Sequence, residues 1–248
     1  VTLENKSYPT TFIYTAGAVR IPDKADFETK FGLFLNKLLM ELMTKYLLTP
    51  TINAVKQDIL KLNSAIISSD IPVFDFKDID TSQLEARIQN PNRNIVRMLL
   101  KSLAYEQQDE LLPARWEIEH IFPQKWQTNY FPDVPDATIK EKIEHIGNKL
   151  PFEKKLNIVA GNGYFAKKKK EYNASKIAIT KAMGTSEIAE WDMDSIMKRD
   201  IRISDSVMAL LSKWNNDYLN IPTVVNEEEK PSEEDLARIE EFKRKGWI

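Results

Sequence analysis

The segment from Trp116 to Gln124 constrains the fold more than any other part of the chain. It holds a short apolar run typical of a strand, and Pro123 ends that run because proline cannot donate a hydrogen bond to a neighbouring strand. Within the run, Glu119 and His120 are adjacent. Histidine is the usual side chain for taking a proton from water near neutral pH, and a carboxylate can hold a hard ion such as Mg²⁺. The pair therefore predicts half of a one-metal hydrolytic site at the end of a strand.

The rest of such a site is expected between residues 145 and 173. Gly147 opens a second strand-like stretch, which is followed by a loop rich in glycine and asparagine and then by a helix containing Lys167–Lys170. The order of strand, loop, strand, loop and helix is that of a ββα unit. Asn148 and Asn157 flank the second strand segment, from where their side-chain amides can reach back to the first strand.

Each of these residues also has an ordinary structural interpretation. A single histidine on a strand is most often a structural residue, and asparagines commonly form turns because they tolerate a left-handed backbone. The ordered series of partners favours a functional role for His120. No such series surrounds His145, which we interpret as a surface or strand-edge residue beside Glu144. A run of four lysines is usually a solvated helix face.

Several motifs occur in one order along this region. The first two are a Glu-His-Ile-x-Pro-Gln strand at Glu119–Gln124 and an Ile-Gly-Asn strand at Ile146–Asn148, followed by two further asparagines, Asn157 and Asn162. Next comes a Phe-x-x-Lys-x-x-x-Tyr-x-x-Ser helix, matched by Phe165, Lys168, Tyr172 and Ser175. The last is a Trp-x-x-x-x-Ile-x-x-Arg pattern, matched by Trp191, Ile196 and Arg199. With them, the segment from Trp116 to about Trp214 resembles the HNH (His-Me finger) nucleases. More narrowly, it resembles the C-terminal nuclease domain of modification-dependent restriction enzymes of the GmrSD type.

The resemblance implies a role for each site residue. His120 is expected to be the general base that activates water, and Asn148 is expected to orient its ring by accepting a hydrogen bond from the other ring nitrogen. Glu119 and Asn157 are expected to hold one Mg²⁺ or Mn²⁺ ion per site, which would stabilise charge on the scissile phosphate. Many HNH nucleases have an aspartate where this chain has Glu119, and the longer side chain would bind the metal directly or through a water.

Basic residues are concentrated beside the expected site. The whole chain has 35 Lys and Arg against 37 Asp and Glu, a net charge of −2. Residues 149–176 alone contain eight lysines and two glutamates, a local charge of +6. A basic surface suits a polyanion because phosphate contacts release counterions. We therefore expect Lys154, Lys155, Lys168 and Lys169 to bind DNA, with Lys168 foremost because it matches the lysine of the helix motif.

The composition restricts both the metal and the compartment. The chain has no cysteine, which excludes disulfides and a thiolate zinc site, and its two histidines are well apart. Oxygen ligands favour Mg²⁺ or Mn²⁺ over softer metals. No secretory or transmembrane stretch is visible, since the most apolar run, residues 31–43, is interrupted by Asn36, Lys37 and Glu41. We expect a cytoplasmic protein with no membrane partner.

We predict an α+β fold that is mostly α-helical, a helical domain with an embedded ββα-metal (His-Me finger) unit. The expected regions are a helical N-terminal region (1–112), a nuclease region with a C-terminal helix (113–220), and a charged linker with a short terminal helix (221–248). Apolar residues at helical spacing predict helices at 27–43, 52–64 and 94–104, and one long or broken helix at 191–219. Residues 73–80 are expected to form a loop or short strand, and the terminal helix is expected to run from Ser232 to Gly246.

The expected function is metal-dependent hydrolysis of DNA phosphodiester bonds by the effector domain of an anti-phage, modification-dependent restriction protein, acting on phage or modified DNA. In the family that this chain resembles, a nucleotide-binding domain with an Asp-Gly-Gln-Gln-Arg motif precedes the nuclease. That motif does not occur here, so we expect the sensing domain to belong to a longer protein. Two alternatives stay open at this point: a non-catalytic DNA-binding or interaction module of the same fold, and an RNase that uses the same site.

Overall fold

The computed structural model describes residues 27–69, 71–78, 80–127 and 133–221, together with residues 237, 240, 241 and 243–245. These residues form two compact units. The first unit contains the described residues up to Thr81 and those from Leu211 onward, and the second contains residues 82–210. One long helix, residues 193–219, contributes residues to both units. The three regions expected from the sequence stay a prediction.

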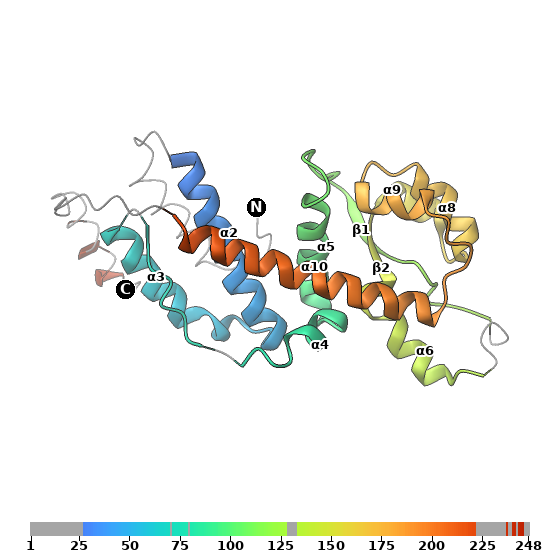
Figure 1. Cartoon of the computed structure of the whole chain (residues 1–248), viewed down its shortest axis with the longest axis horizontal. Coiled ribbons are helices and arrows are strands. Elements are labelled where there is room, and N and C mark those ends of the chain that lie inside the picture. The colour runs from blue at the N-terminus through green and yellow to red at the C-terminus, as the bar shows by residue number, and fades with distance from the viewer. Residues whose placement is uncertain are drawn as a thin grey trace. The chain divides into compact units, whose positions relative to one another are not determined.

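The first unit is helical. It contains α2 (Phe27–Leu48), a 3₁₀ turn (Ile52–Ala54), α3 (Lys56–Ser68) and the C-terminal end of α10 (Met193–Leu219), which is one unbroken helix (Figure 1). The helices expected at 27–43 and 191–219 are therefore confirmed. The helix expected at 52–64 begins and ends about one turn later, after the 3₁₀ turn. The buried apolar side chains of this unit are Phe34, Leu38, Leu42, Val55, Ile59, Leu62, Ile66, Tyr218 and Ile221.

The segment after α3 is held by hydrogen bonds rather than by a strand. In its described part, residues 71–78 and 80, the backbone forms no β-ladder. Lys45 Nζ donates to the carbonyl oxygen of Lys77 at 2.6 Å and lies 3.2 Å from a carboxylate oxygen of Asp58. Asp58 in turn accepts a hydrogen bond from the amide of Lys77 at 3.1 Å. The buried Lys45–Asp58 pair therefore satisfies both backbone groups of Lys77 in this loop.

The second unit contains the only strands among the described residues. Strands β1 (Trp116–His120) and β2 (Lys149–Glu153) are antiparallel, and His120 is paired with Lys149. The structure is thus mostly helical with a small two-stranded sheet, as the sequence pattern predicted. The helices of this unit are α4 (Leu84–Gln89), α5 (Arg93–Tyr105), α6 (Asp136–Ile143), α7 (Lys154–Ala160), α8 (Phe165–Asn173), α9 (Ala178–Thr185) and the N-terminal part of α10.

Helices surround the two strands. α5 and α9 contact β2, α7 contacts both strands, and α8 packs against α9 (Figure 1). Between the strands the chain forms α6 and a 3₁₀ turn (Ile146–Asn148) that the sequence pattern did not predict. Helix α6 has only two buried apolar residues, Ile139 and Ile143, so its amphipathic signal is weak.

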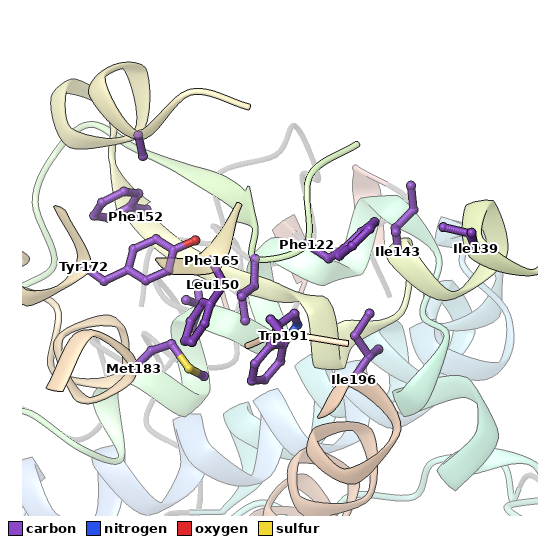
Figure 2. Close-up of a cluster of buried hydrophobic side chains, with 12 residues drawn as sticks. Phe122, Ile139, Ile143, Leu150, Phe152, Phe165, Tyr172, Met183, Trp191 and Ile196 are labelled. Atoms are coloured by element: carbon purple, nitrogen blue, oxygen red, sulfur yellow. The ribbon is translucent and has the colours of Figure 1, made fainter. Parts of the chain in front are cut away.

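A row of aromatic side chains joins the sheet to the helices that cover it (Figure 2). The ring of Phe152 on β2 contacts Tyr172 on α8 with 5.1 Å between centroids. Phe165 lies 6.4 Å from Tyr172 and 5.5 Å from Trp191, which precedes α10. These rings are buried and supply much of the apolar contact that fixes α8 against the sheet.

Two further expectations concern the ends of the chain and the membrane. The limits of the expected terminal helix, Ser232 and Gly246, lie outside the described residues, while residues 237, 240, 241, 243 and 244 are helical. No helix in the described part of the chain is long and apolar enough to cross a membrane.

Gly184 in α9 allows close contact with α8. A Cβ atom there would lie 2.7 Å from the Cα of Asn173 and from the carbonyl carbon of Tyr172. We expect Gly184→Ala to lower the free energy of unfolding by about 1–3 kcal/mol, because backbone atoms cannot move aside as a flexible side chain can.

Gly32→Ala in α2 is the matched control, since a Cβ there meets no atom within 4 Å. It should be neutral or stabilise the protein by about 0.4–1 kcal/mol, because alanine favours helix. Urea unfolding of both variants measures the difference, and equal stability would show that α8 and α9 are not closely packed at Gly184.

Candidate active site at the end of strand β1

His120 is the last residue of β1, and its side chain is 16% exposed. Its Nε2 lies 3.4 Å from Oε1 of Glu144, which follows α6. The carboxylate of Glu144 also pairs with Lys149, whose Nζ lies 3.0 Å from Oε2 and donates to the carbonyl oxygen of Glu144 at 2.5 Å. Because Lys149 is opposite His120 in the sheet, the strand pairing brings imidazole, carboxylate and ammonium together.

The surroundings of His120 lower the pKa of its ring, which favours the neutral imidazole. Burial lowers the pKa of His120, the carboxylate of Glu144 raises it and the ammonium of Lys149 lowers it, with a net pKa below the ordinary value. Burial alone would raise the pKa of Glu144, but the contacts with Lys149 hold that pKa below its usual value. We assign the ring proton to Nε2, which faces the carboxylate, and this leaves the lone pair of Nδ1 to accept a proton.

Glu119 points into the protein rather than toward His120. Its Oε1 accepts hydrogen bonds from Lys168 Nζ at 2.6 Å and from the hydroxyl of Tyr172 at 2.8 Å. Lys168 and Tyr172 are four residues apart on α8 and therefore share one helix face. Lys168 also donates to the carbonyl oxygen of His120 at 2.6 Å. One buried ammonium thus neutralises Glu119 and fixes the backbone of the candidate base.

This arrangement does not fit Glu119 as a ligand of Mg²⁺ or Mn²⁺. An ammonium group 2.6 Å from the carboxylate already supplies the positive charge, and the side chain is buried. Asn157, the second expected ligand, lies on α7 and is partly exposed. In the described part of the chain, no group of three or more His, Cys, Asp or Glu side chains is placed to hold a metal ion.

Asn148 supports the site through the backbone instead of through the ring of His120. Its Oδ1 accepts hydrogen bonds from the amide of Phe122 at 2.7 Å and from the indole of Trp191 at 3.2 Å. Its Nδ2 donates to the carbonyl oxygens of Phe122 at 3.0 Å and Ile143 at 3.1 Å. All four hydrogen-bonding positions of the amide are used. Asn148 therefore does not bond to the imidazole as expected. Instead, its hydrogen bonds fix the loop that follows His120.

Asn162 and Tyr164 hold the next part of the same loop. The side chain of Asn162 accepts from the amide of Lys125 at 3.2 Å and donates to its carbonyl oxygen at 2.6 Å. The hydroxyl of Tyr164 accepts from the amide of Gln127 at 3.1 Å. The loop that follows His120 is thus fixed by the segment that leads into α8.

His145 is buried, so its interpretation as a surface or strand-edge residue is wrong. Its Nδ1 lies 2.7 Å from Oδ2 of Asp200, a residue of α10 that the sequence analysis did not single out. Oδ1 of Asp200 accepts from the amide of Gly147 at 2.6 Å. The neighbouring Arg199 donates to the carbonyl oxygens of Gly147 at 2.7 Å and Lys149 at 2.8 Å. Helix α10 therefore holds the turn that leads into β2.

Two of the four lysines expected to bind DNA are used inside the protein. Lys168 is 1% exposed, so its assignment as the foremost phosphate contact is corrected by its bonds to Glu119 and His120. Lys169 donates to the carbonyl oxygens of Ser186 at 2.6 Å and Ile188 at 2.9 Å. The other two, Lys154 and Lys155, lie on α7 and reach solvent.

The comparisons with known proteins agree with the order of the motifs. Residues 74–205, slightly more than half of the chain, match the family described as GmrSD restriction endonucleases, C-terminal domain. The chain belongs to this family. The match covers almost all of the second unit, including both strands and the residues around His120. No curated protein and no solved structure matches the chain significantly. Membership of a restriction endonuclease family makes this unit a nuclease domain with DNA as its substrate class.

Glu144 and Lys149 were not predicted from the sequence as neighbours of His120. A signal for Lys149 existed, because antiparallel pairing of the two predicted strands would place the start of the second beside the end of the first. No comparable signal existed for Glu144, because its position depends on α6 and the 3₁₀ turn.

The buried pair of Glu119 and Lys168 generates a stability prediction. Lys168→Met should lower the free energy of unfolding by about 3–5 kcal/mol, because it leaves a buried carboxylate without its counter-charge. Lys167→Gln is the matched control on the same helix, and its exposed side chain should matter by less than about 0.5 kcal/mol.

The double variant Glu119→Gln with Lys168→Met should be less destabilised than the sum of the two single changes, because it removes both charges together. Urea unfolding of the four proteins closes this cycle. Additive effects would show that the two charges do not interact in the folded chain.

Proposed function

We propose that this chain is an HNH-type endonuclease that hydrolyses DNA phosphodiester bonds with His120 as the general base. The observation that carries the proposal is the placement of His120: an imidazole at a strand end, 3.4 Å from the carboxylate of Glu144 and fixed through its backbone by Lys168, with a pKa that burial lowers. A general base must be unprotonated at the working pH and held within reach of the attacking water. The family of the chain supplies the substrate class.

In the proposed reaction, Nδ1 of His120 takes a proton from a water molecule. The water oxygen forms a bond to phosphorus as the bond to the 3′ oxygen breaks, and solvent protonates that oxygen. The products are a 5′-phosphate and a 3′-hydroxyl. Glu144 stabilises the imidazolium that forms, because its carboxylate lies 3.4 Å from Nε2. The side chains of Lys154, Lys155 and Lys167 are available to the phosphates of the substrate.

We further propose that activity requires Mg²⁺ or Mn²⁺, as expected from the sequence, with ligands that do not include Glu119 in the arrangement seen here. The wider proposal is a cytoplasmic, anti-phage restriction system in which this chain cuts phage or modified DNA, and a nucleotide-binding domain senses the modification. Family membership supports this wider proposal.

The central test is cleavage of supercoiled plasmid by purified His120→Ala. Its rate should fall by about 10²–10⁴ relative to the native chain. Circular dichroism and duplex binding should stay unchanged, because His120 lies outside the apolar core of this unit. Glu85→Gln is the control: Glu85 is an exposed acid on α4 of the same unit, and the rate of its variant should equal that of the native chain.

Parallel reactions with Mg²⁺, with Mn²⁺ and with EDTA test the metal requirement. Cleavage that persists in EDTA would exclude a metal. A native chain that binds DNA but never cuts it would identify a non-catalytic binding module, and preferential cutting of single-stranded RNA would identify an RNase.

The pH dependence of kcat/KM tests the role of Glu144. For the native chain the acidic limb reports protonation of the base and should lie below the ordinary histidine value of pH 6.5, because burial lowers the pKa of His120. Glu144→Gln removes a carboxylate that raises this pKa, so the limb should move to still lower pH while the maximal rate falls.

Glu141→Gln is the matched control for this measurement. Glu141 is a neighbouring acid on α6 that approaches His145 and not His120, at 3.9 Å. Its variant should leave the limb in place. A limb that moves to higher pH in Glu144→Gln would contradict the proposed contact between Glu144 and His120.

A further inference from the structure

Helix α7 ends in two strongly exposed apolar side chains, Ile158 at 71% and Val159 at 63%. Among the strongly exposed large apolar residues that the structure describes, they are the only two adjacent in sequence. Another part of the same helix faces the apolar core of the second unit, where Ala160 is buried and Leu156 is partly buried. The pair therefore points away from the core on a helix that the core holds in place.

Basic side chains lie on the same helix and beside the loop that follows it. Lys154 and Lys155 lie four residues before Ile158 and Val159, on the same helix faces. The side chain of Lys167 lies against the loop that follows α7. The Cδ atom of Lys167 would be 3.0 Å from a Cβ atom built on Gly163. An acidic side chain on this side of the sheet is Glu117, which lies 3.5 Å from Lys154.

The same loop connects the pair to the candidate base. Asn162, three residues after Val159, bonds to both the amide and the carbonyl group of Lys125. Lys125 belongs to the loop that begins directly after His120. A polyanion that contacts the end of α7 is therefore close to the segment that carries His120.

We propose that Ile158 and Val159 enter the minor groove of duplex DNA and wedge open a base step near the bond that is cut. The inference rests on the proposed function and adds how the substrate is held. Apolar side chains inserted between base steps kink DNA in other minor-groove proteins, while basic residues hold the backbone on either side. The β-branched side chains are stiff, so little rotamer freedom is given up on insertion.

The first experiment measures duplex affinity at several salt concentrations by fluorescence anisotropy, with all variants in the His120→Ala chain so that DNA stays intact. The double change Ile158→Ser with Val159→Ser should weaken binding by about tenfold, because two apolar side chains are no longer buried against the bases. The slope of log affinity against log salt should not change, because an apolar contact releases no counterions.

Two control variants are measured in the same way. Leu111→Ser changes a side chain that is 85% exposed elsewhere in the same unit, and it should leave the affinity unchanged. Lys154→Gln with Lys155→Gln should instead flatten the salt slope, by about 0.9 for each phosphate that is no longer bound.

The second experiment compares a paired duplex with one that carries a central mismatch. An opened base step costs less at a mismatch, so the chain with Ile158 and Val159 should bind the mismatched duplex several-fold more tightly, by analogy with base-flipping enzymes, and the Ser variant should not show that preference.

Three outcomes would overturn the wedge. The first is an unchanged affinity of the Ser variant, and the second is a change in its salt slope equal to that of the lysine variant. The third is self-association in sedimentation that depends on Ile158 and Val159, which would identify a contact between copies of the chain. The proposed function fails separately, if the native chain does not cut plasmid, whether or not it binds duplex.

Discussion

The side-chain amide of Asn148 joins four segments of the nuclease unit at one buried point. It bonds both the amide and the carbonyl group of Phe122, which follows β1, as well as the carbonyl of Ile143 in α6 and the indole of Trp191 before α10. A buried amide without partners costs free energy, so moving any one of these segments would leave a buried polar group unsatisfied. The backbone carbonyl of the same residue accepts from Ile121 at 2.9 Å. The position of the candidate base therefore depends on a residue that does not touch its ring.

Much of the nuclease unit could be predicted from the sequence, because its elements carry local signals. The run that ends at Pro123 formed β1, the stretch after Gly147 formed β2, and the lysine-rich segment formed α8. The contacts of His145 could not be predicted, because its partner Asp200 is 55 residues away on another helix. The same holds for Glu144, whose position is set by α6. Long-range pairing of polar groups depends on the packed fold and leaves no periodic trace in the chain.

Lys168 shows how a local pattern could have been used further. On α8, Phe165, Lys168 and Tyr172 are spaced by three and four residues and thus occupy one face. Two of these three are aromatic, so that face predicts burial, and a lysine on it needs a carboxylate partner. Glu119 on the apolar strand was the natural candidate. The order of the motifs indicated the correct family. Lys168 was nevertheless predicted to bind DNA, because that prediction did not take into account which face of the helix each lysine occupies.

A buried ion pair beside the base also has a chemical consequence. The bond from Lys168 to the carbonyl oxygen of His120 and the bond to Glu119 originate at one nitrogen, so movement of the strand end would break a charge pair as well as a hydrogen bond. Separating such a pair in a low-dielectric interior is costly. The backbone of His120 is therefore held by a charged group, and the Nε2 atom of its ring lies near both Glu144 and the side-chain amide of Gln124. This is the restriction of freedom that a general base requires, because a base that must be ordered at each turnover gives up part of its rate advantage.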